Sequence, residues 1–305
     1  DEDVLEYQTT LLTYKQKKAQ LIDHEIIDKV LETFRMSATS LNKYLRCPLA
    51  FYFENILRVP MARKSSNGFG NAIHLALELF FRDIEKSPER DIPPLDKLKE
   101  YFQFGMKKFH SHFTNQEFEL STTRGLKLLE EYYNEYQNSW KLPRQFEMEM
   151  DIKTEYAGVP ISGKIDRIDI YDNHVNVIDY KTGRYDSKKL KPPVGDEDLG
   201  GDYWRQVVFY NLLLKGEDRV KYPMNKGYMD FVEIDKDAFK LKDFEVSDFE
   251  IDIVADQLKD SYQKIKAHQF SDGCGEVECK WCNFVNENSK IQLPNLEEDE
   301  ALEIA

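Results

Sequence analysis

The chain has 305 residues, a formal net charge of −14, 41% hydrophobic residues and 32% charged residues. This length can bury a sizeable core, and the composition excludes collagen-like, disordered and membrane-spanning chains. No apolar run approaches the roughly 18 residues needed to span a bilayer, and the acidic, polar residues 1–10 lack the pattern of a signal peptide.

Helical patterns dominate the first half of the chain. Residues 1–36 are predicted as a charged helical extension. A helix follows, for which Ser37, Thr39 or Ser40 supplies the cap, and Pro48 interrupts or restarts it. Composition predicts a loop over residues 63–70. Three further helices are predicted at 71–86 (ending before Pro88), 93–112 and 122–140.

Alternating patterns dominate the second half of the chain. Polar and apolar residues alternate over four stretches, which predict strands at 145–156, 161–171, 174–183 and 226–235. A polar loop is expected at 186–202, and helices are expected at 203–216 and 248–270. This order predicts one α/β domain, in which helices flank a small mixed β-sheet.

Two carboxylates face each other in the predicted central hairpin. If Asp172 and Asn173 form the turn, counting back along both strands brings Asp166 opposite Asp179, with Cβ atoms roughly 5 Å apart. Their face of the hairpin is otherwise apolar and is expected to pack inward. The other face carries Arg167, Asp169, His174 and Asn176 and is expected to be solvated.

Facing carboxylates on a buried surface need a proton or a cation. Mg²⁺ prefers such oxygen ligands. Lys181 points to the same face, where it can activate a water or stabilise a developing negative charge. The set Asp166, Asp179 and Lys181 suits phosphodiester hydrolysis, while a plain salt bridge between Lys181 and Asp179 is the structural alternative.

Cysteines provide a second chemical pattern. Cys47 stands alone, whereas Cys274, Cys279 and Cys282 form a C-x4-C-x2-C cluster. In an intracellular chain this pattern favours a metal or an iron–sulfur cluster over disulfides.

Several motifs together resemble the RecB/AddB-type nucleases of the PD-(D/E)XK superfamily. They are G-K-I-D-R-I-D and V-I-D-Y-K-T-G, preceded by S-L-N-K-Y-L-R-C-P-L-A-F-Y-F-E and G-N-A-I-H-L-A-L-E, and followed by Q-V-V-F-Y. They occur in the family's order and span about residues 37–285. The resemblance implies a restriction-endonuclease-like core, with a mixed central sheet between helices and a helical N-terminal part.

The resemblance also implies roles for individual residues. His74, Asp166 and Asp179 correspond to side chains that bind the metal, and the backbone carbonyl of Tyr180 corresponds to a further ligand. Lys181 corresponds to the catalytic lysine.

Three more positions follow from the resemblance. Gln206 and Tyr210 correspond to residues that place the DNA backbone near the metal, and their i, i+4 spacing puts them on one helix face. The family often has a glutamate on the strand before the hairpin, and Glu147 is the accessory residue chosen here, although Glu149 also alternates along this strand.

For the cysteines, the resemblance implies a 4Fe–4S cluster held by Cys47, Cys274, Cys279 and Cys282. The order of the gaps departs from the family's terminal triple, and Asn288 stands where its last cysteine is expected. A zinc site and free thiols therefore stay open as alternatives.

The implied function is a Mg²⁺- or Mn²⁺-dependent DNA nuclease, with exonuclease action favoured, in DNA end processing and recombinational repair. An acidic domain binds DNA poorly by itself, which fits a nuclease delivered by a helicase domain in the same chain or complex. The start without Met and the acidic end favour a C-terminal piece of a longer protein.

The expected organisation is a helical extension at 1–36, a nuclease domain at 37–289 and an acidic, disordered tail at 290–305. We expect a cytoplasmic, nucleoid-associated protein without a membrane partner. The alternative functions are a non-catalytic module that binds DNA ends, and an interaction domain centred on a metal or an iron–sulfur cluster.

Overall fold

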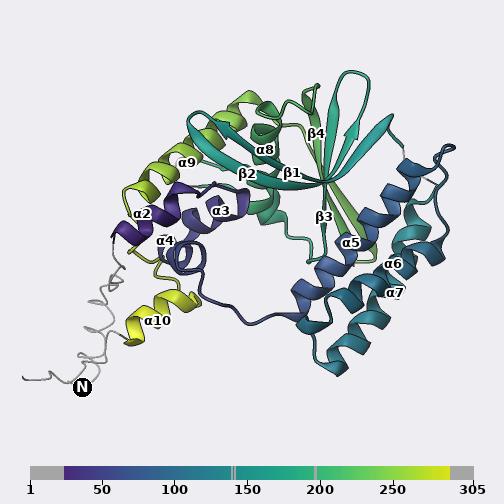
Figure 1. The fold of residues 1–305 in the computed structure, drawn as a ribbon, viewed down its shortest axis with the longest axis horizontal. Coiled ribbons are helices and arrows are strands. Elements are labelled where there is room, and N and C mark those ends of the chain that lie inside the picture. Colours follow the sequence, from purple (N-terminus) through teal and green to yellow (C-terminus); the bar gives the residue numbers. More distant parts are fainter. Residues whose placement is uncertain (1–23, 139, 141, 196–197, 289–305) are drawn as a thin grey trace, which may run out of the picture. The chain divides into compact units, whose positions relative to one another are not determined.

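The computed structural model describes residues 24–138, 140, 142–195 and 198–288 (Figure 1). These residues divide into two compact units. One unit comprises residues 35–42 and 60–260, and the other comprises residues 24–34, 43–59 and 261–288. Most of the predicted extension at 1–36 and the whole predicted tail at 290–305 lie outside the described residues.

The larger unit is built on a five-stranded mixed sheet, which confirms the predicted fold class. Its strands follow one another in chain order: β1 (Gln145–Tyr156), β2 (Val159–Ile170), β3 (Val175–Lys181), β4 (Met224–Asp235) and β5 (Ala238–Phe244). Neighbouring strands are antiparallel except β3 and β4, which are parallel. Parallel neighbours need a crossover connection, and α8 (Asp202–Lys215) supplies it.

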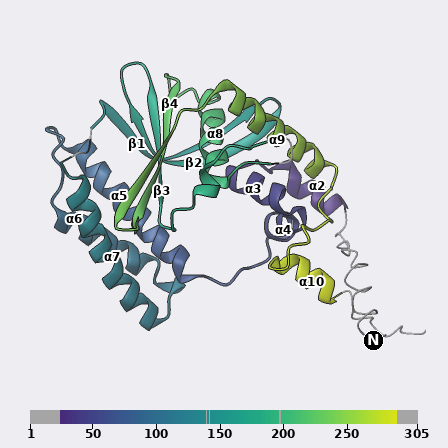
Figure 2. The same cartoon turned by 180° about the vertical axis from the view of Figure 1, so that it is seen from behind.

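Helices cover both faces of this sheet (Figures 1 and 2). One layer consists of three helices, α5 (Ser65–Lys86), α6 (Leu95–Lys108) and α7 (Asn115–Tyr136), with the short helix η2 (His110–His112). The opposite layer holds α8, with η3 (Ser187–Leu190) beside it and the first part of α9 (Asp248–Lys266). Apolar cores lie on both sides, because strand and helix side chains interdigitate there.

The smaller unit is helical and rich in aromatic contacts. Its elements are α2 (His24–Glu32), the end of α3 (Ala38–Arg46), α4 (Pro48–Phe51), the π-helix η1 (Tyr52–Ile56) and α10 (Lys280–Asn288). Phe53 stacks on Trp281 with ring centroids 4.4 Å apart, and Tyr52 stacks on Phe270 at 5.2 Å. These rings join segments that are more than 200 residues apart in the chain.

Helix ends follow local capping chemistry, in part as predicted. The hydroxyl of Ser37 accepts from the backbone N–H of Ser40, and Pro48 opens α4 after the capping residue Cys47. The predicted loop at 63–70 is wrong beyond Lys64, because α5 already begins at Ser65. Gly68 lies inside α5, where a Cβ would come within 2.6 Å of the His112 Cβ, so close helix packing explains this glycine.

Two other elements differ from the prediction. Helix α7 begins at Asn115 instead of residue 122, because Thr114 and Glu117 form a reciprocal capping box. Strand β5 was not predicted, since its hairpin turn is Lys236-Asp237 instead of an Asn-Gly pair. Both turn residues have the positive φ angles that this turn requires.

The expectation of a solvated second hairpin face is wrong. Asp169 is 5% exposed and Asn176 is 9% exposed, because α5 and α7 cover this face. Arg167 neutralises Asp169 through two hydrogen bonds of 2.8 and 3.1 Å, which allows both charges to be buried. Among the described residues, no helix is long and apolar enough to cross a membrane.

Candidate active site

The β2–β3 hairpin has the predicted register. Ile168 pairs with Val177 and Arg167 pairs with Ile178, so Asp166 and Asp179 are the next residues in the same register. The turn is closed by a hydrogen bond of 3.0 Å from the backbone N–H of Tyr171 to the carbonyl of His174. The two neighbouring strands thus bring both acids to one site.

Helix α5 brings His74 to the first of these acids. Its Nδ1 lies 3.3 Å from Asp166 Oδ2, and the same oxygen accepts a hydrogen bond of 2.9 Å from the backbone N–H of Tyr180. Burial by itself lowers the pKa of His74, but the hydrogen bond and charge of Asp166 raise it above the usual value. The carboxylate of Asp166 thus favours the protonated form of His74.

Glu149 on β1 completes this side of the site. It lies opposite Asp166 in the β1–β2 register, and ligand atoms of His74, Glu149 and Asp166 all lie within 4.8 Å of one another. Glu149 has a φ of +57°, which is uncommon and costly for a residue with a side chain inside a strand. Its carboxylate forms an ion pair with Lys164.

The structure does not place Glu147 in this group. Its carboxylate instead accepts a hydrogen bond of 3.1 Å from the side chain of Gln145. The sequence did contain the missing signal, because Ala157-Gly158 forms a tight turn with both φ angles positive. Counting back from this turn brings Glu149, two residues beyond Glu147, opposite Asp166.

A second cluster surrounds Asp179. Lys181 Nζ lies 2.6 Å from Asp179 Oδ2, while Tyr210 and Gln206 from α8 donate to Asp179 Oδ1 at 2.5 and 3.0 Å. The amide oxygen of Gln206 accepts from Lys181 at 2.8 Å. Gln206 thus bridges the lysine and the acid, and fixes both side chains.

Burial dominates the electrostatics of this cluster. It raises the pKa of Asp179, and the nearby charge of Asp166 acts in the same direction although Lys181 opposes both. Burial alone would lower the pKa of Lys181, but the charge of Asp179 raises it. Lys181 therefore stays protonated at neutral pH. For Asp166, burial is outweighed by His74 and the Tyr180 N–H, which lower the pKa.

A cleft of about 620 Å³ opens over the first group. His74, Glu149 and Asp166 line it, together with the basic side chains of Lys108 and Lys164. A negatively charged substrate can approach through this cleft despite the acidic net charge, since local cations decide phosphate binding.

The donor set fits a divalent metal ion. It combines one imidazole nitrogen and two carboxylates, which are suitable ligands for Mg²⁺ or Mn²⁺. The three side chains come from α5, β1 and β2 of the same unit, and Asp179 lies next to Asp166 on the neighbouring strand.

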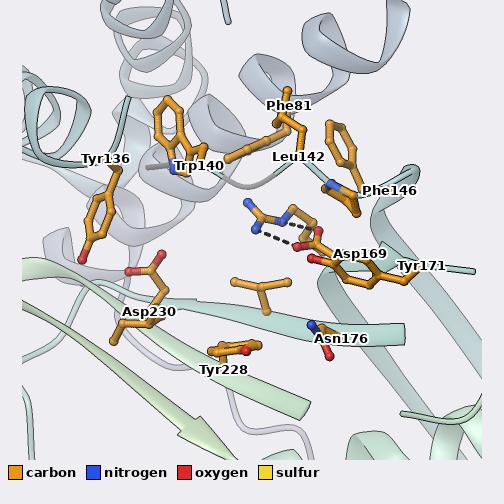
Figure 3. Close-up of a pocket in the computed structure, with 14 residues that line it drawn as sticks. Phe81, Tyr136, Trp140, Leu142, Phe146, Asp169, Tyr171, Asn176, Tyr228 and Asp230 are labelled. Carbon is orange, nitrogen blue, oxygen red and sulfur yellow. Dashed lines mark hydrogen bonds and ion pairs between the residues drawn. The ribbon is translucent and has the colours of Figure 1, made fainter. Parts of the chain in front are cut away.

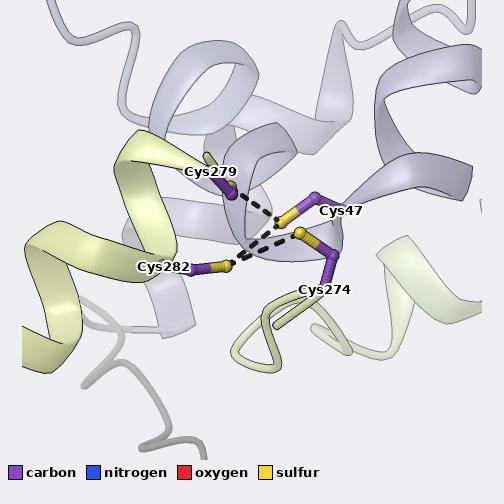
Figure 4. A group of neighbouring side chains, drawn as sticks. All are labelled: Cys47, Cys274, Cys279 and Cys282. Carbon is purple, nitrogen blue, oxygen red and sulfur yellow. Dashed lines mark hydrogen bonds between the residues drawn. The ribbon is translucent and has the colours of Figure 1, made fainter. Parts of the chain in front are cut away.

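The four cysteines converge in the smaller unit (Figure 4). The Sγ–Sγ separations are 3.9 Å for Cys47–Cys282, 3.7 Å for Cys274–Cys282 and 3.9 Å for Cys47–Cys279. None of the four forms a disulfide. Cys47 caps α4 and Cys282 lies in α10, so the group joins two distant segments of the chain.

These thiols suit a metal centre. Four sulfurs around one tetrahedral ion at ~2.3 Å would be about 3.8 Å apart, which is close to these three separations, and all four sulfurs lie within 4.8 Å of one another. In a four-iron cluster each cysteine binds a different iron, so the sulfurs would have to spread. The donor chemistry accommodates both groups.

Comparisons with known proteins agree with this arrangement. A family model described as the PD-(D/E)XK nuclease superfamily matches residues 35–286. An uncharacterized protein of Rickettsia felis is 28% identical over 213 residues, which cover 63% of this chain and 24% of that protein. The chain therefore spans about a quarter of the length of this relative.

A solved structure from Eubacterium rectale, provisionally named an exonuclease, has a similar fold. The match has a TM-score of 0.50 at 12% identity, and it covers 87% of this chain and 93% of that one. Since the family model spans most of the chain and the sheet carries the expected acids and lysine, the protein belongs to the PD-(D/E)XK nuclease superfamily.

Proposed function

We propose that the protein is a metal-dependent DNA nuclease that hydrolyses phosphodiester bonds in the cleft over His74, Glu149 and Asp166. The observation that carries this proposal is the convergence of these three ligands beside the Asp179–Lys181 pair. A divalent metal ion bound there would polarise the phosphate and supply a reactive water at neutral pH.

The side chains of the site have two different roles, metal binding and charge stabilisation. His74, Glu149 and Asp166 would hold the ion, with Asp179 and the backbone carbonyl of Tyr180 as further ligands. Lys181, protonated and half-buried, is suited to stabilise the negative charge that develops on the phosphate.

Gln206 and Tyr210 act as positioning residues in this proposal. Tyr210 is 3% exposed, and its hydroxyl donates to Asp179, so its first task is to orient that carboxylate. Gln206 does the same for Lys181. Any guidance of the DNA backbone by these two residues then acts through the acid and the lysine.

The cysteine group acts as a structural centre in the smaller unit. The resemblance to RecB/AddB-type nucleases favours a 4Fe–4S cluster, whereas the sulfur separations suit zinc. Iron, sulfide and zinc analysis of protein purified without oxygen separates the two: one cluster per chain gives four irons and visible absorbance, and a zinc site gives neither.

The nuclease domain is expected to be part of a longer protein. The Rickettsia felis relative is about four times as long as the matched region, which supports a nuclease module within a longer protein. A RecB/AddB-type helicase–nuclease, acting at DNA ends during recombinational repair, fits the acidic charge because the helicase would deliver the DNA.

The proposal is tested with end-labelled linear DNA, single-stranded and double-stranded, incubated with Mg²⁺, Mn²⁺ or EDTA. We expect cleavage with either ion and none with EDTA, and the labelled products give the polarity. DNA binding without cleavage under all these conditions would instead favour a non-catalytic module that binds DNA ends.

A further inference from the structure

A second cavity lies on the face of the sheet that α5 and α7 cover, away from the cleft lined by His74, Glu149 and Asp166. It is lined by side chains of Arg167 and Asp169 on β2 and of Asp230 on β4, with α5 and α7 above it. Side chains alternate along a strand, so Arg167 and Asp169 point to the face opposite Asp166. The cavity is therefore distinct from the cleavage cleft.

Aromatic rings form most of its walls (Figure 3). The six rings belong to Phe81, Tyr136, Trp140, Phe146, Tyr171 and Tyr228. The volume is about 300 Å³, which lies at the lower end of the range for small-molecule sites. Flat ring surfaces around a small space favour a planar aromatic ligand.

Arg167, which lines the cavity, has protein partners for its hydrogen bonds. Arg167 gives Nε and one terminal nitrogen to Asp169 and donates its other terminal nitrogen to the hydroxyl of Tyr180 at 2.6 Å. The guanidinium also lies over the ring of Phe81, 4.3 Å from the centroid. Each of its three nitrogens thus donates at least one hydrogen bond to the protein.

Asp230 is the group left with an unused acceptor. Its Oδ2 accepts from Tyr132 at 2.6 Å, but its buried Oδ1 has no hydrogen-bond partner among the described residues. The residue is 8% exposed, and Figure 3 shows its carboxylate directed into the space between Tyr136 and Asp169. A buried acceptor of this kind calls for a donor from a ligand.

We propose that this pocket binds a nucleobase that carries an exocyclic amino group. The aromatic walls stack on the planar base, and the amino group donates to Asp230 Oδ1. Stacking is available to every base, so the carboxylate supplies the selectivity. The inference goes beyond the proposed cleavage activity, and its test needs no catalysis.

The experiment titrates the full chain with free nucleosides in EDTA, at pH 7.5, by isothermal calorimetry. Two matched pairs serve as probes: cytidine against uridine, and adenosine against inosine, in which a carbonyl replaces the amino group. We expect at least about 10-fold tighter binding of the amino member of each pair.

Three variants identify the pocket. Asp230→Asn keeps an acceptor for Tyr132 but offers an amide N–H₂ to the ligand, and should abolish the preference for amino bases. Leu241→Arg obstructs the pocket at a residue that is 53% exposed, where substitution spares folding, and should weaken all binding. Lys181→Ala should bind nucleosides like the wild type.

Other outcomes overturn the inference. It is wrong if none of the four nucleosides binds, or if amino and carbonyl members bind equally well. Loss of binding in Lys181→Ala, with Leu241→Arg unaffected, would also contradict it, because the nucleoside would then occupy the cleavage cleft. A failed cleavage assay leaves this test untouched, so the two proposals fail separately.

Discussion

Glu149 illustrates how one backbone conformation can serve a site. Its φ of +57° costs on the order of 1–3 kcal/mol for a residue with a side chain, yet it lies inside strand β1. The carboxylate that results faces His74 and Asp166. Strain at this position is consistent with a role in metal binding.

This role predicts a difference between two neighbouring glutamates. Glu149→Gln removes a charged oxygen ligand, so the Mg²⁺ concentration for half-maximal cleavage should rise at least about 10-fold. Glu147→Gln is the matched control on the same strand and should change it by no more than about twofold. A metal titration of cleavage rates measures both, and equal effects would contradict the assignment.

The acids of the central hairpin differ in how far the sequence predicts their surroundings. The facing pair Asp166 and Asp179 could be predicted, because a two-residue turn fixes the register of both strands. Burial of Asp169 could not, since its partner Arg167 and the covering helices depend on tertiary packing. A strand's alternation gives its two faces but does not say how many of them are covered.

At the scale of elements, α6 and α7 meet at a position that allows no side chain. A Cβ on Gly125 would come within 2.1 Å of the buried ring of Phe102. Gly125→Ala gains about 1 kcal/mol of helix propensity but forces the ring to move, and the expected net loss is about 1–2 kcal/mol.

Urea unfolding measures this loss of stability. Gly183→Ala serves as a control, because the nearest atom to its added Cβ is the Tyr203 hydroxyl at 4.0 Å. Its free energy of unfolding should change by less than about 0.5 kcal/mol. A Gly125→Ala variant that is as stable as the wild type would contradict the expected clash between the added Cβ and the ring of Phe102.

Glu54 joins η1 to α10 in the smaller unit. It lies 2.6 Å from Lys43 Nζ and 2.9 Å from Lys280 Nζ, and it accepts a hydrogen bond of 2.8 Å from the indole of Trp281. Burial raises its pKa, but these three partners outweigh burial and lower it to about 2.

A lowered pKa makes the stability of this unit depend on acid. The contribution of ionised Glu54 is complete above the ordinary value near 4.5 and is lost as the pH falls toward about 2. The tryptophan fluorescence of the protein, to which Trp281 contributes, should therefore show a transition between pH 5 and pH 2 that is weaker in Glu54→Gln. The exposed Glu278→Gln should keep the wild-type profile; a profile shared by all three proteins would contradict the linkage.

Element boundaries were predictable wherever local chemistry dominates. The alternation of β1 fixed its limits, and the apolar pattern before Pro88 fixed the end of α5. Starts of α5 and α7 were harder, because a glycine-containing first turn and a Thr–Glu capping box resemble loop composition. Strand β5 escaped prediction since Lys236-Asp237 is an uncommon hairpin turn.

At the scale of the whole molecule, the chain carries two chemical centres in separate units. The candidate cleavage site belongs to the sheet unit, and the cysteine group belongs to the helical unit. Four thiols within one cluster, held by α4, α10 and the segment before α10, are suited to hold that unit closed when a metal centre is bound.

Loss of the cysteine centre should lower the melting temperature of the protein. Cys282→Ser removes a buried ligand, and the melting temperature should fall by about 5–10 °C. Wild-type protein stripped with a chelator should melt at the same temperature as the variant. A chelator without effect on wild-type melting would mean that the thiols act without a metal.

The convergence of the cysteines could be anticipated only through the resemblance to a family. Their spacing alone suggested metal binding for three of them, whereas Cys47 lies more than 200 residues earlier. Likewise, Gln206 and Tyr210 could be selected from a motif, but their contacts with Asp179 and Lys181 required the packing of α8 on the sheet.

The central claim is that the Asp179–Lys181 pair beside the His74, Glu149 and Asp166 group performs DNA cleavage. Its most direct test compares Lys181→Ala with Lys189→Ala in Mg²⁺-dependent cleavage of linear DNA. Both lysines lie over the ring of Tyr203, with Nζ 4.8 and 5.4 Å from its centroid, but only Lys181 contacts Asp179. We expect a loss of at least about 10²-fold for Lys181→Ala and a rate near that of the wild type for Lys189→Ala. Full cleavage by folded Lys181→Ala would contradict the claim.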